Sequence, residues 1–215
     1  MTHRCFDFTA MAPRDCYKLL IGSVVPRPIA WVTSVSPDGV VNAAPYSFFN
    51  CLSSDPPILA LGVENKPSQA FKDTAWNIRT TEQFTVNIVG DANMAAMNIT
   101  ATPFPPDIDE LAIAGLTAVP GTSVVSPRIA EAPVSFECHR HTTIEVGKSR
   151  EIILGRVLTA FIREDIVDPV RHHVDPRGLD AVGRMGGDGY ARTRDYFDLP
   201  TFKSYPPDTE DGASG

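Results

Sequence analysis

Two lysines and a threonine lie close together in the stretch ENKPSQAFKDTAWNI, at Lys66, Lys72 and Thr74. Helical turns are expected here, and the free amides at a helix N-terminus attract anions. A lysine and a hydroxyl beside those amides would add one charge and one donor, so the pattern predicts a phosphate site in principle. The alternative is that Asp73 caps the helix and Lys72 is solvated.

A second segment with unusual composition is NAAPYSFFN, Asn42 to Asn50. It is too polar for a core strand and too apolar for an ordinary loop, so we interpret it as a loop that follows a hairpin. It could hold a planar ligand, with backbone amides against its polar edge and Tyr46 or Phe48 on its face. A core-packing loop or a dimer contact explains the same residues.

Histidines suggest a metal at two places. In ECHRH, His139 and His141 share one face of a strand and can ligate one ion, and RHH contains His172 and His173. No further ligand follows at a typical zinc spacing, which favours polar-face residues. A haem or metal protein stays a third hypothesis for function.

Four glycines occur in GRMGGDGYAR, Gly183 to Arg192. The run is neither a GxGxxG after a strand nor a GxxxxGK[ST], which excludes a dinucleotide fold and a P-loop. Such glycine density permits close backbone approach to a partner. The chain offers no GxSxG elbow, no Ser-His-Asp or Cys-His set and no evident pair of carboxylates.

The segments described above are expected to be positioned mainly by β-strands. A hairpin is expected from Ile29 to Ser36 and onward from Val40, because Pro37-Asp38-Gly39 is a turn signal. Further strands are expected over 56–64, 83–89, 134–146 and 151–162, the last two joined by GKSR. Helices are expected over 13–24, 65–81 and 91–101, the last capped by Asp91. Residues 102–133 are expected to cross the surface, and the chain is loop-like from Asp165.

Strands joined by short turns, with helices as insertions, favour a closed or half-closed antiparallel barrel over a βαβ sheet. We expect one domain over residues 1–200 and a disordered tail over 201–215, which contains PPDTEDGASG.

The composition excludes several classes of protein. The length of 215 residues and 43% hydrophobic content suit one globular domain, and a net charge of −7 argues against a nucleic-acid surface. No apolar run approaches the roughly 18 residues of a membrane span, and no signal peptide is expected. The four scattered cysteines predict reduced thiols in a cytoplasmic protein.

Four pieces carry a family resemblance: PRPIAWVTSVSPDGVVNAAPYSFFNCLSSDPPILALGV, KDTAWNIRTTEQFTVNIV, EIILGRV and VGRMGGDGYAR. In this order, from Pro26 to Arg192, they resemble the flavin reductase-like, FMN-binding split-barrel family. They are most similar to its longer branch, which includes flavoredoxin-like proteins and nitrilotriacetate monooxygenase component B. The resemblance implies a mainly β fold, an antiparallel Greek-key split β-barrel with inserted helices, and FMN as cofactor.

The resemblance also implies a site. The strand ending at Thr33-Ser34 and the loop 42–50 would line the flavin ring and ribityl chain, and the helix start at residues 72–74 would hold the phosphate. Asp73 suits the cap better than the phosphate, because two anions repel. Phe48 and Phe49 would form the pocket and its dimer wall. The implied cofactor-binding residues are Arg27, Thr33, Ser34, Asn42, Ala44, Pro45, Tyr46, Ser47, Phe48, Asn50, Lys66, Lys72, Asp73, Thr74 and Arg184, with Tyr190 as a further contributor.

One departure bears on NAD(P)H. Shorter members carry a Gly-Asp-His before an Ile-Gly-Glu-Val strand, with the His near the nicotinamide. Here the matching run is KSREIILGRV, so Arg150 replaces that His and Arg156 replaces the acid. This puts the contacts to the pyridine nucleotide in doubt.

The function that the resemblance implies is an NAD(P)H:FMN oxidoreductase, cytoplasmic and homodimeric, that passes reduced flavin to an acceptor such as a flavin-dependent monooxygenase. The chemistry belongs to the cofactor, so no catalytic side chain is expected. The alternative is a flavin-binding electron carrier or sensor without NAD(P)H turnover.

Overall fold

The structure is a computed structural model that describes residues 1–68, 70–147 and 150–201. The tail expected over 201–215 lies outside the described residues except for Thr201, and so do the two middle residues of the GKSR turn. Within the described part, no helix is both long and apolar enough to span a membrane.

Seven strands form one antiparallel sheet in the order β3-β2-β6-β9-β10-β5-β4. Their bounds are β2 (Ala30–Val35), β3 (Val41–Tyr46), β4 (Phe49–Ser54), β5 (Pro57–Glu64), β6 (Gln83–Ile88), β9 (Val134–Val146) and β10 (Arg150–Ile162). β3 and β4 lie at opposite ends of this order, yet only Ser47 and Phe48 join them. Three residue steps span at most about 11 Å, so the sheet must curl until its edges approach.

The two edges approach without forming a ladder: among the strands described, β3 pairs with β2 and β4 with β5. The barrel is therefore split between β3 and β4. This arrangement confirms the expected mainly β, antiparallel split barrel.

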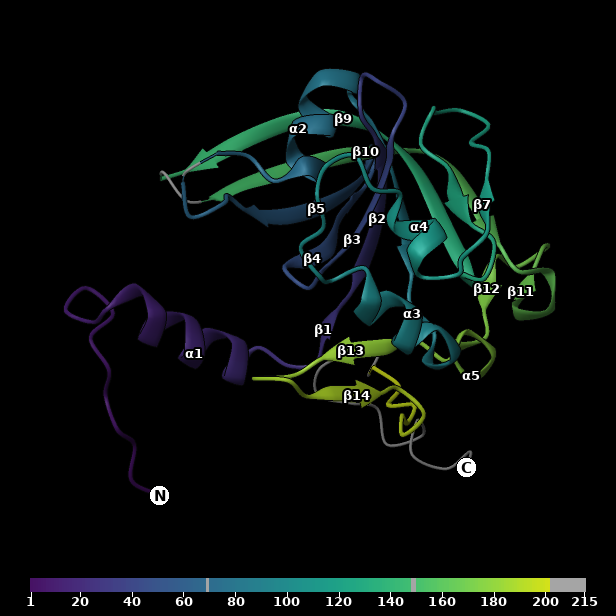
Figure 1. The fold of residues 1–215 in the computed structure, drawn as a ribbon. Coiled ribbons are helices and arrows are strands. Elements are labelled where there is room, and N and C mark those ends of the chain that lie inside the picture. Colours follow the sequence, from purple (N-terminus) through teal and green to yellow (C-terminus); the bar gives the residue numbers. More distant parts are fainter. Residues whose placement is uncertain (69, 148–149, 202–215) are drawn as a thin grey trace, which may run out of the picture.

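Short strands and helices complete the fold (Figure 1). Three small sheets contain β1 (Arg27–Pro28) with β13 (Val182–Arg184) and β14 (Tyr190–Arg192), β7 (Ala118–Val119) with β8 (Arg128–Ile129), and β11 (Val167–Asp168) with β12 (His173–Val174). The helices are α1 (Pro13–Ser23), α2 (Asp73–Thr81), α3 (Met94–Ile99), α4 (Glu110–Ile113) and α5 (Pro176–Leu179), with 3-10 turns η1 (Asp91–Asn93) and η2 (Glu164–Ile166). Helix α1 stands away from the barrel, whereas α3 and α4 contact β3.

Strand β2 is buried on both faces, which explains its continuous apolar run. Ala30 and Val32 belong to the cluster inside the barrel, with Phe84. Ile29 and Trp31 belong to a second cluster outside it, together with Met97, Leu111, Ile129 and Val182. Successive side chains of a strand point to opposite faces, so those of β2 pack alternately into the two clusters.

The second cluster corrects the expectation for residues 102–133. Leu111 and Ile129 are each 1% exposed and complete that core, so this segment is more than a surface excursion. A sequence rich in Pro, Gly and Ala concealed two short elements, α4 and β8, which each bury one apolar side chain.

Three other local expectations also need correction. The segment Asn42 to Asn50 contains all of β3 except its first residue, a turn and the start of β4, rather than a loop. Helix α2 begins at Asp73 instead of Asn65, since Pro67 disfavours helical backbone in the residue before it. Asp91 is no helix cap; its carboxylate pairs with Arg192 and Arg194.

Candidate functional site

The outer edge of β3 is the starting point of the site. The N–H of Ala43 points away from β2 and donates to the carboxylate of Glu110 on α4. Backbone direction alternates along a strand, so residue 45 faces the same way as residue 43. That residue is Pro45, which has no N–H and is tolerated only at such an edge. The exposed side of β3 is thus covered by side chains instead of another strand.

A cavity of about 430 Å³ lies between this edge and the start of α2. It brings together most of the predicted phosphate and ring residues with the segment that follows α3. Its lining includes Asn42, Ala44, Pro45, Tyr46, Lys66, Lys72, Asp73, Thr74, Thr100, Phe104 and Glu110.

A second cavity, of about 610 Å³, adjoins the first at Pro45 and Ala101. It contains the predicted Ser47, Arg184 and Tyr190. The Arg184 guanidinium lies 4.5 Å from the centre of the Tyr190 ring and donates to the Gly187 carbonyl at 2.6 Å. The glycine-rich hairpin β13–β14 therefore forms one wall of a groove that runs along β3.

The start of α2 carries one free cation. Lys66 Nζ lies 2.9 Å from the Asp73 carboxylate, which neutralises that lysine. Within residues 1–68, 70–147 and 150–201, no hydrogen bond or ion pair holds the ammonium group of Lys72. The prediction that Asp73 caps the helix is wrong: Lys72 occupies the cap position and makes no side-chain cap bond, while Asp73 is the first helical residue.

A line of hydrogen bonds connects Glu110 to the helix start. The amide nitrogen of Asn42 donates to the Glu110 carboxylate at 2.5 Å. The amide oxygen of Asn42 accepts from the Thr74 hydroxyl at 2.7 Å, and from the Ser34 hydroxyl at 3.4 Å. Asn42 is thereby fixed between two cavity-lining groups on different elements.

Glu110 is the functional residue that sequence reasoning missed. It is 7% exposed, and burial raises the pKa of its carboxyl to about 7, against the lowering effect of the Ala43 and Asn42 hydrogen bonds. The Asp109 side chain caps α4 by accepting from the amides of Leu111 and Ala112. An Asp before an apolar run could have revealed this short helix, but no local pattern indicates that Glu110 is buried.

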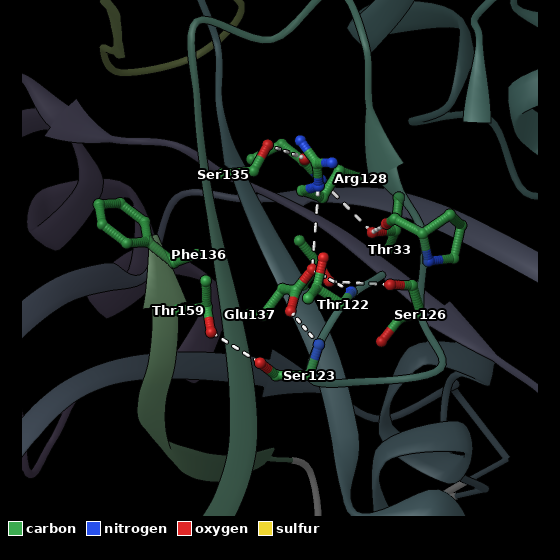
Figure 2. A network of polar contacts seen from close by, with 12 residues as sticks. Thr33, Thr122, Ser123, Ser126, Arg128, Ser135, Phe136, Glu137 and Thr159 are labelled. Carbon is green, nitrogen blue, oxygen red and sulfur yellow. Dashed lines mark hydrogen bonds and ion pairs between the residues drawn. The ribbon is translucent and has the colours of Figure 1, made fainter. Parts of the chain in front are cut away.

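Thr33 and Ser34 face the protein interior rather than the groove. Both are fully buried, because β2 is covered on both faces. The Thr33 hydroxyl donates to the Pro127 carbonyl at 2.5 Å. Figure 2 shows it beside the loop whose Thr122 and Ser123 amides donate to Glu137, at 2.8 and 2.6 Å. In a single chain, Ser34 reaches the groove only through Asn42.

Arg27 supports the site from behind. Its guanidinium donates to the carbonyls of Ile21, Val24 and Met185 at 2.6 to 2.9 Å, and Nε reaches Ser47 Oγ at 3.5 Å. It therefore ties α1 and the β13–β14 hairpin to the turn after β3. The predicted Asn50 is exposed on β4, where its side chain accepts from the next backbone amide.

The aromatic pair Phe48 and Phe49 divides between two roles. Phe48 lines a third hollow, of about 120 Å³, with Tyr17, Lys72 and Arg150. The Arg150 guanidinium lies 4.9 Å from the centre of the Phe48 ring and 3.5 Å from Glu64. Phe49 is partly buried and packs against the barrel core, which corrects the expectation that it lies apart from the monomer core. Its place in a dimer wall stays a prediction. The side chain that replaces the expected His thus lies beside the predicted phosphate end.

The histidines do not form a metal site in the part of the chain that the structure describes, where no group of three His, Cys, Asp or Glu side chains could hold an ion. His139 lies 3.8 Å from Glu82 at the surface.

The groove fits the FMN that the resemblance implies. Its two cavities are within the size range of cofactor sites. One end has a free lysine and the open amides of a nine-residue helix, which suit a phosphate. The rest has apolar walls from β3 and α3 with a few polar groups, which suit a ring and a polyol chain.

Comparison with known proteins identifies relatives along nearly the whole chain. The family described as "Flavin reductase like domain" matches residues 21–176. An uncharacterized protein from Deinococcus radiodurans is 44% identical over 205 residues, 93% of this chain and 90% of that protein.

Two solved structures are similar in fold and sequence. Nitrilotriacetate monooxygenase component B from Bacillus cereus has a TM-score of 0.89 at 32% identity, covering 93% of this chain and 100% of that one. The 2-nitrobenzoate 2-nitroreductase from Pseudomonas fluorescens has a TM-score of 0.85 at 35% identity, covering 94% and 97%.

The buried carboxyl of Glu110 predicts how stability depends on pH. Its folded-state pKa of about 7 exceeds the ordinary value of 4.5. The unfolded chain therefore releases this proton first, and the contribution to stability is lost as the pH rises through 7. Relative to Glu110→Gln, the wild-type free energy of unfolding should fall by about 3 kcal/mol between pH 4.5 and 8. Urea unfolding across this range measures the difference, and parallel profiles would contradict it.

Proposed function

This chain belongs to the flavin reductase-like family, and on that premise we propose that it is an oxidoreductase that binds FMN and reduces it with NAD(P)H. The observation that carries the proposal is Lys72, a cation with no described partner at the start of α2. It lines the same cavity as the edge of β3. A site with one free positive charge at one end and a long, mostly apolar groove beyond it suits a flavin with a single phosphate.

Each part of the groove has a role in this proposal. Lys72 and the first amides of α2 hold the phosphate. The cavity walls at Ala44, Pro45 and Tyr46 receive the ring system. When bound, FMN supplies the two-electron redox chemistry, and the protein supplies orientation and electrostatics. No side chain has to act as a general acid or base in the transfer.

Negative charge that develops on a reduced flavin ring needs a donor or a cation nearby. Ser47 is the first residue after β3 and lines the adjoining cavity, so its amide is one candidate. Arg184 is the cation that lines the adjoining cavity. We assign NAD(P)H to this larger cavity, where it would lie next to the ring.

One observation favours a second candidate, an electron carrier without NAD(P)H turnover. Arg150 takes the place of the expected His, and its guanidinium is already engaged with Phe48 and Glu64. For the reductase, the acceptor that we propose is a flavin-dependent monooxygenase supplied with reduced flavin. A similar structure is named as a monooxygenase component, and another as a nitroreductase.

We further propose a cytoplasmic homodimer. Helix α1 buries only Ile21 and stands away from the barrel (Figure 1). Tyr17 and Leu20 on this helix are 43% and 48% exposed, and Val24, directly after it, is 59% exposed. A second copy would cover this apolar surface. Because Tyr17 also lines the hollow beside Phe48, the same contact would close that hollow. All four cysteines are free, as is usual where thiols are kept reduced.

Removal of the Lys72 charge should weaken FMN binding selectively. A charge-assisted hydrogen bond contributes about 1.5–3 kcal/mol, so Lys72→Ala should raise the dissociation constant for FMN at least tenfold. Riboflavin, which lacks the phosphate, should bind both proteins alike. Arg171→Ala is the control, since it removes one exposed positive charge between β11 and β12, a turn that lines neither cavity of the groove. Equal losses for FMN and riboflavin would place the phosphate elsewhere.

Anaerobic titration of the FMN-loaded protein with NADH and with NADPH tests the activity. A reductase should lose its visible flavin absorbance within seconds of mixing with at least one nucleotide. A carrier should bleach with dithionite but with neither nucleotide, and that result would favour the second candidate.

Dilution tests the dimer. If each site is completed by the α1 region of a second copy, flavin should be released as the mass falls to that of a monomer. Light scattering and flavin fluorescence over one dilution series measure both. Leu20→Glu should shift the transition to higher protein concentration. A monomer that retains FMN at every concentration would contradict the proposal.

A further inference from the structure

We propose that FMN binding to this chain is coupled to the uptake of one proton by Glu110, through a turn of the Asn42 amide that frees the Thr74 hydroxyl to donate to the phosphate. This inference rests on the proposed function, since it concerns the same cavity. It assigns a regulatory role to a buried carboxyl that redox chemistry does not use.

The three groups form a directed line. Glu110 accepts from Asn42 at 2.5 Å, and Asn42 in turn accepts from Thr74 at 2.7 Å. Thr74 is 1% exposed and lies in the first turn of α2, where it lines the cavity together with Lys72. Each residue comes from a different element, so packing of α4 and α2 against β3 sets the line.

The charge on Glu110 determines which group donates and which accepts in each hydrogen bond of this line. An ionised carboxylate can only accept, so the Asn42 amide must present its nitrogen to Glu110 and its oxygen to Thr74. A hydroxyl can donate only one hydrogen bond, and the Thr74 hydroxyl donates it to the Asn42 oxygen. In this state Thr74 presents only lone pairs to an anion in the cavity, which opposes a phosphate.

When Glu110 takes up a proton from solvent, donor and acceptor exchange places in the hydrogen bonds of this line. Both observed bonds end on the same oxygen, Glu110 Oε2. When this oxygen is protonated, its O–H donates to the Asn42 oxygen once the amide has turned, while a lone pair of the same oxygen still accepts from Ala43. The Asn42 nitrogen then donates to the Thr74 oxygen, and the Thr74 proton is free for the phosphate. No covalent bond other than the one to the added proton changes. The buried Ser34 hydroxyl loses its 3.4 Å acceptor on Asn42 and keeps the bond that it accepts from Asn77 at 3.2 Å.

The surroundings of Glu110 poise it for this change. Burial raises its pKa to about 7, and the carboxylates of Asp73 and Asp109 add to the rise. Lys66 offsets Asp73 by pairing with it. Glu110 lines the groove cavity at the start of α2 and also a further cavity, of about 430 Å³, on the side of Asp38 and Asp107. The other charged or titratable side chains that line these two cavities are Asp38, Tyr46, Lys66, Lys72, Asp73 and Asp107. Lys72 faces the cavity and favours an anion in both states, so the proton decides how well it binds.

The direction in which FMN affinity changes with pH follows from the charge on Glu110. Glu110 is neutral below about pH 7 and ionised above it, so FMN should bind less tightly as the pH rises. Ionisation of the phosphate itself, with a pKa near 6, acts in the opposite direction by strengthening its attraction to Lys72. A fall in affinity above pH 7 therefore cannot come from the ligand.

The test is the dissociation constant for FMN and for riboflavin between pH 6 and 8.5, measured by fluorescence quenching. For wild type, FMN affinity should fall about tenfold across this range, the contribution of one hydrogen bond to a charged group. Glu110→Gln should abolish the fall. Riboflavin should show no such fall in either protein. Calorimetry in two buffers of different ionisation enthalpy should detect proton uptake near pH 7.5 in wild type only.

Thr74 variants separate the hydrogen-bond line from simple repulsion between Glu110 and the phosphate. Thr74→Val keeps the shape and removes the hydroxyl, so it should bind FMN weakly and without the fall above pH 7. Thr74→Ser restores the hydroxyl and should restore the fall. A fall that persists in Thr74→Val would overturn the proposal in favour of repulsion, and it requires no Glu110 variant to fold.

Two outcomes distinguish failure of the proton coupling from failure of the proposed FMN site. If wild type prefers FMN to riboflavin but has the same pH profile as Glu110→Gln, the cofactor proposal stands and the coupling is refuted. If wild type binds FMN no better than riboflavin at any pH, the proposed phosphate site fails, and the coupling fails with it.

Discussion

The unpaired outer edge of β3 is the constraint on which the site depends. The sheet curls until its two end strands approach, but β3 and β4 do not form a ladder in the described structure. Half of the backbone groups of β3 therefore need other partners. Glu110 accepts from Ala43, and Pro45 has no donor to satisfy. The groove exists because polar side chains and a proline, rather than an eighth strand, complete this edge.

Burial of Glu110 is a consequence of core packing. Its neighbour Leu111 is 1% exposed and completes the cluster outside the barrel, beside Trp31. Anchoring Leu111 brings the first turn of α4, and with it Glu110, against β3. A carboxylate in that position loses hydration, and two hydrogen bonds only partly compensate, so its pKa rises. The apolar core thus determines the electrostatics of the polar groove.

The charges around the groove are arranged so that one cation is left over. Lys66 is neutralised by Asp73, and the guanidinium of Arg27 is occupied by three backbone carbonyls. Arg150 is held by Glu64 and the Phe48 ring. Lys72 has no such partner among the described residues, which makes it the natural counter-charge for one anionic group. The other cations mainly hold the walls in position.

The sequence by itself determined the elements with strong periodicity and the family. The two long strands β9 and β10 were predicted to within a residue, because alternation over twelve or more positions has few interpretations. The residues along Asn42–Tyr46 and at the start of α2 were assigned to one site by the family resemblance, and the fold brings them together around one cavity. Tertiary structure alone decided that Thr33 is buried, that Phe49 packs inside the barrel and that Glu110 meets Asn42. The physical reason is that Glu110 and Asn42 are 68 residues apart. Whether a side chain faces a core or a groove depends on which elements cover its strand, and no local pattern contains that information.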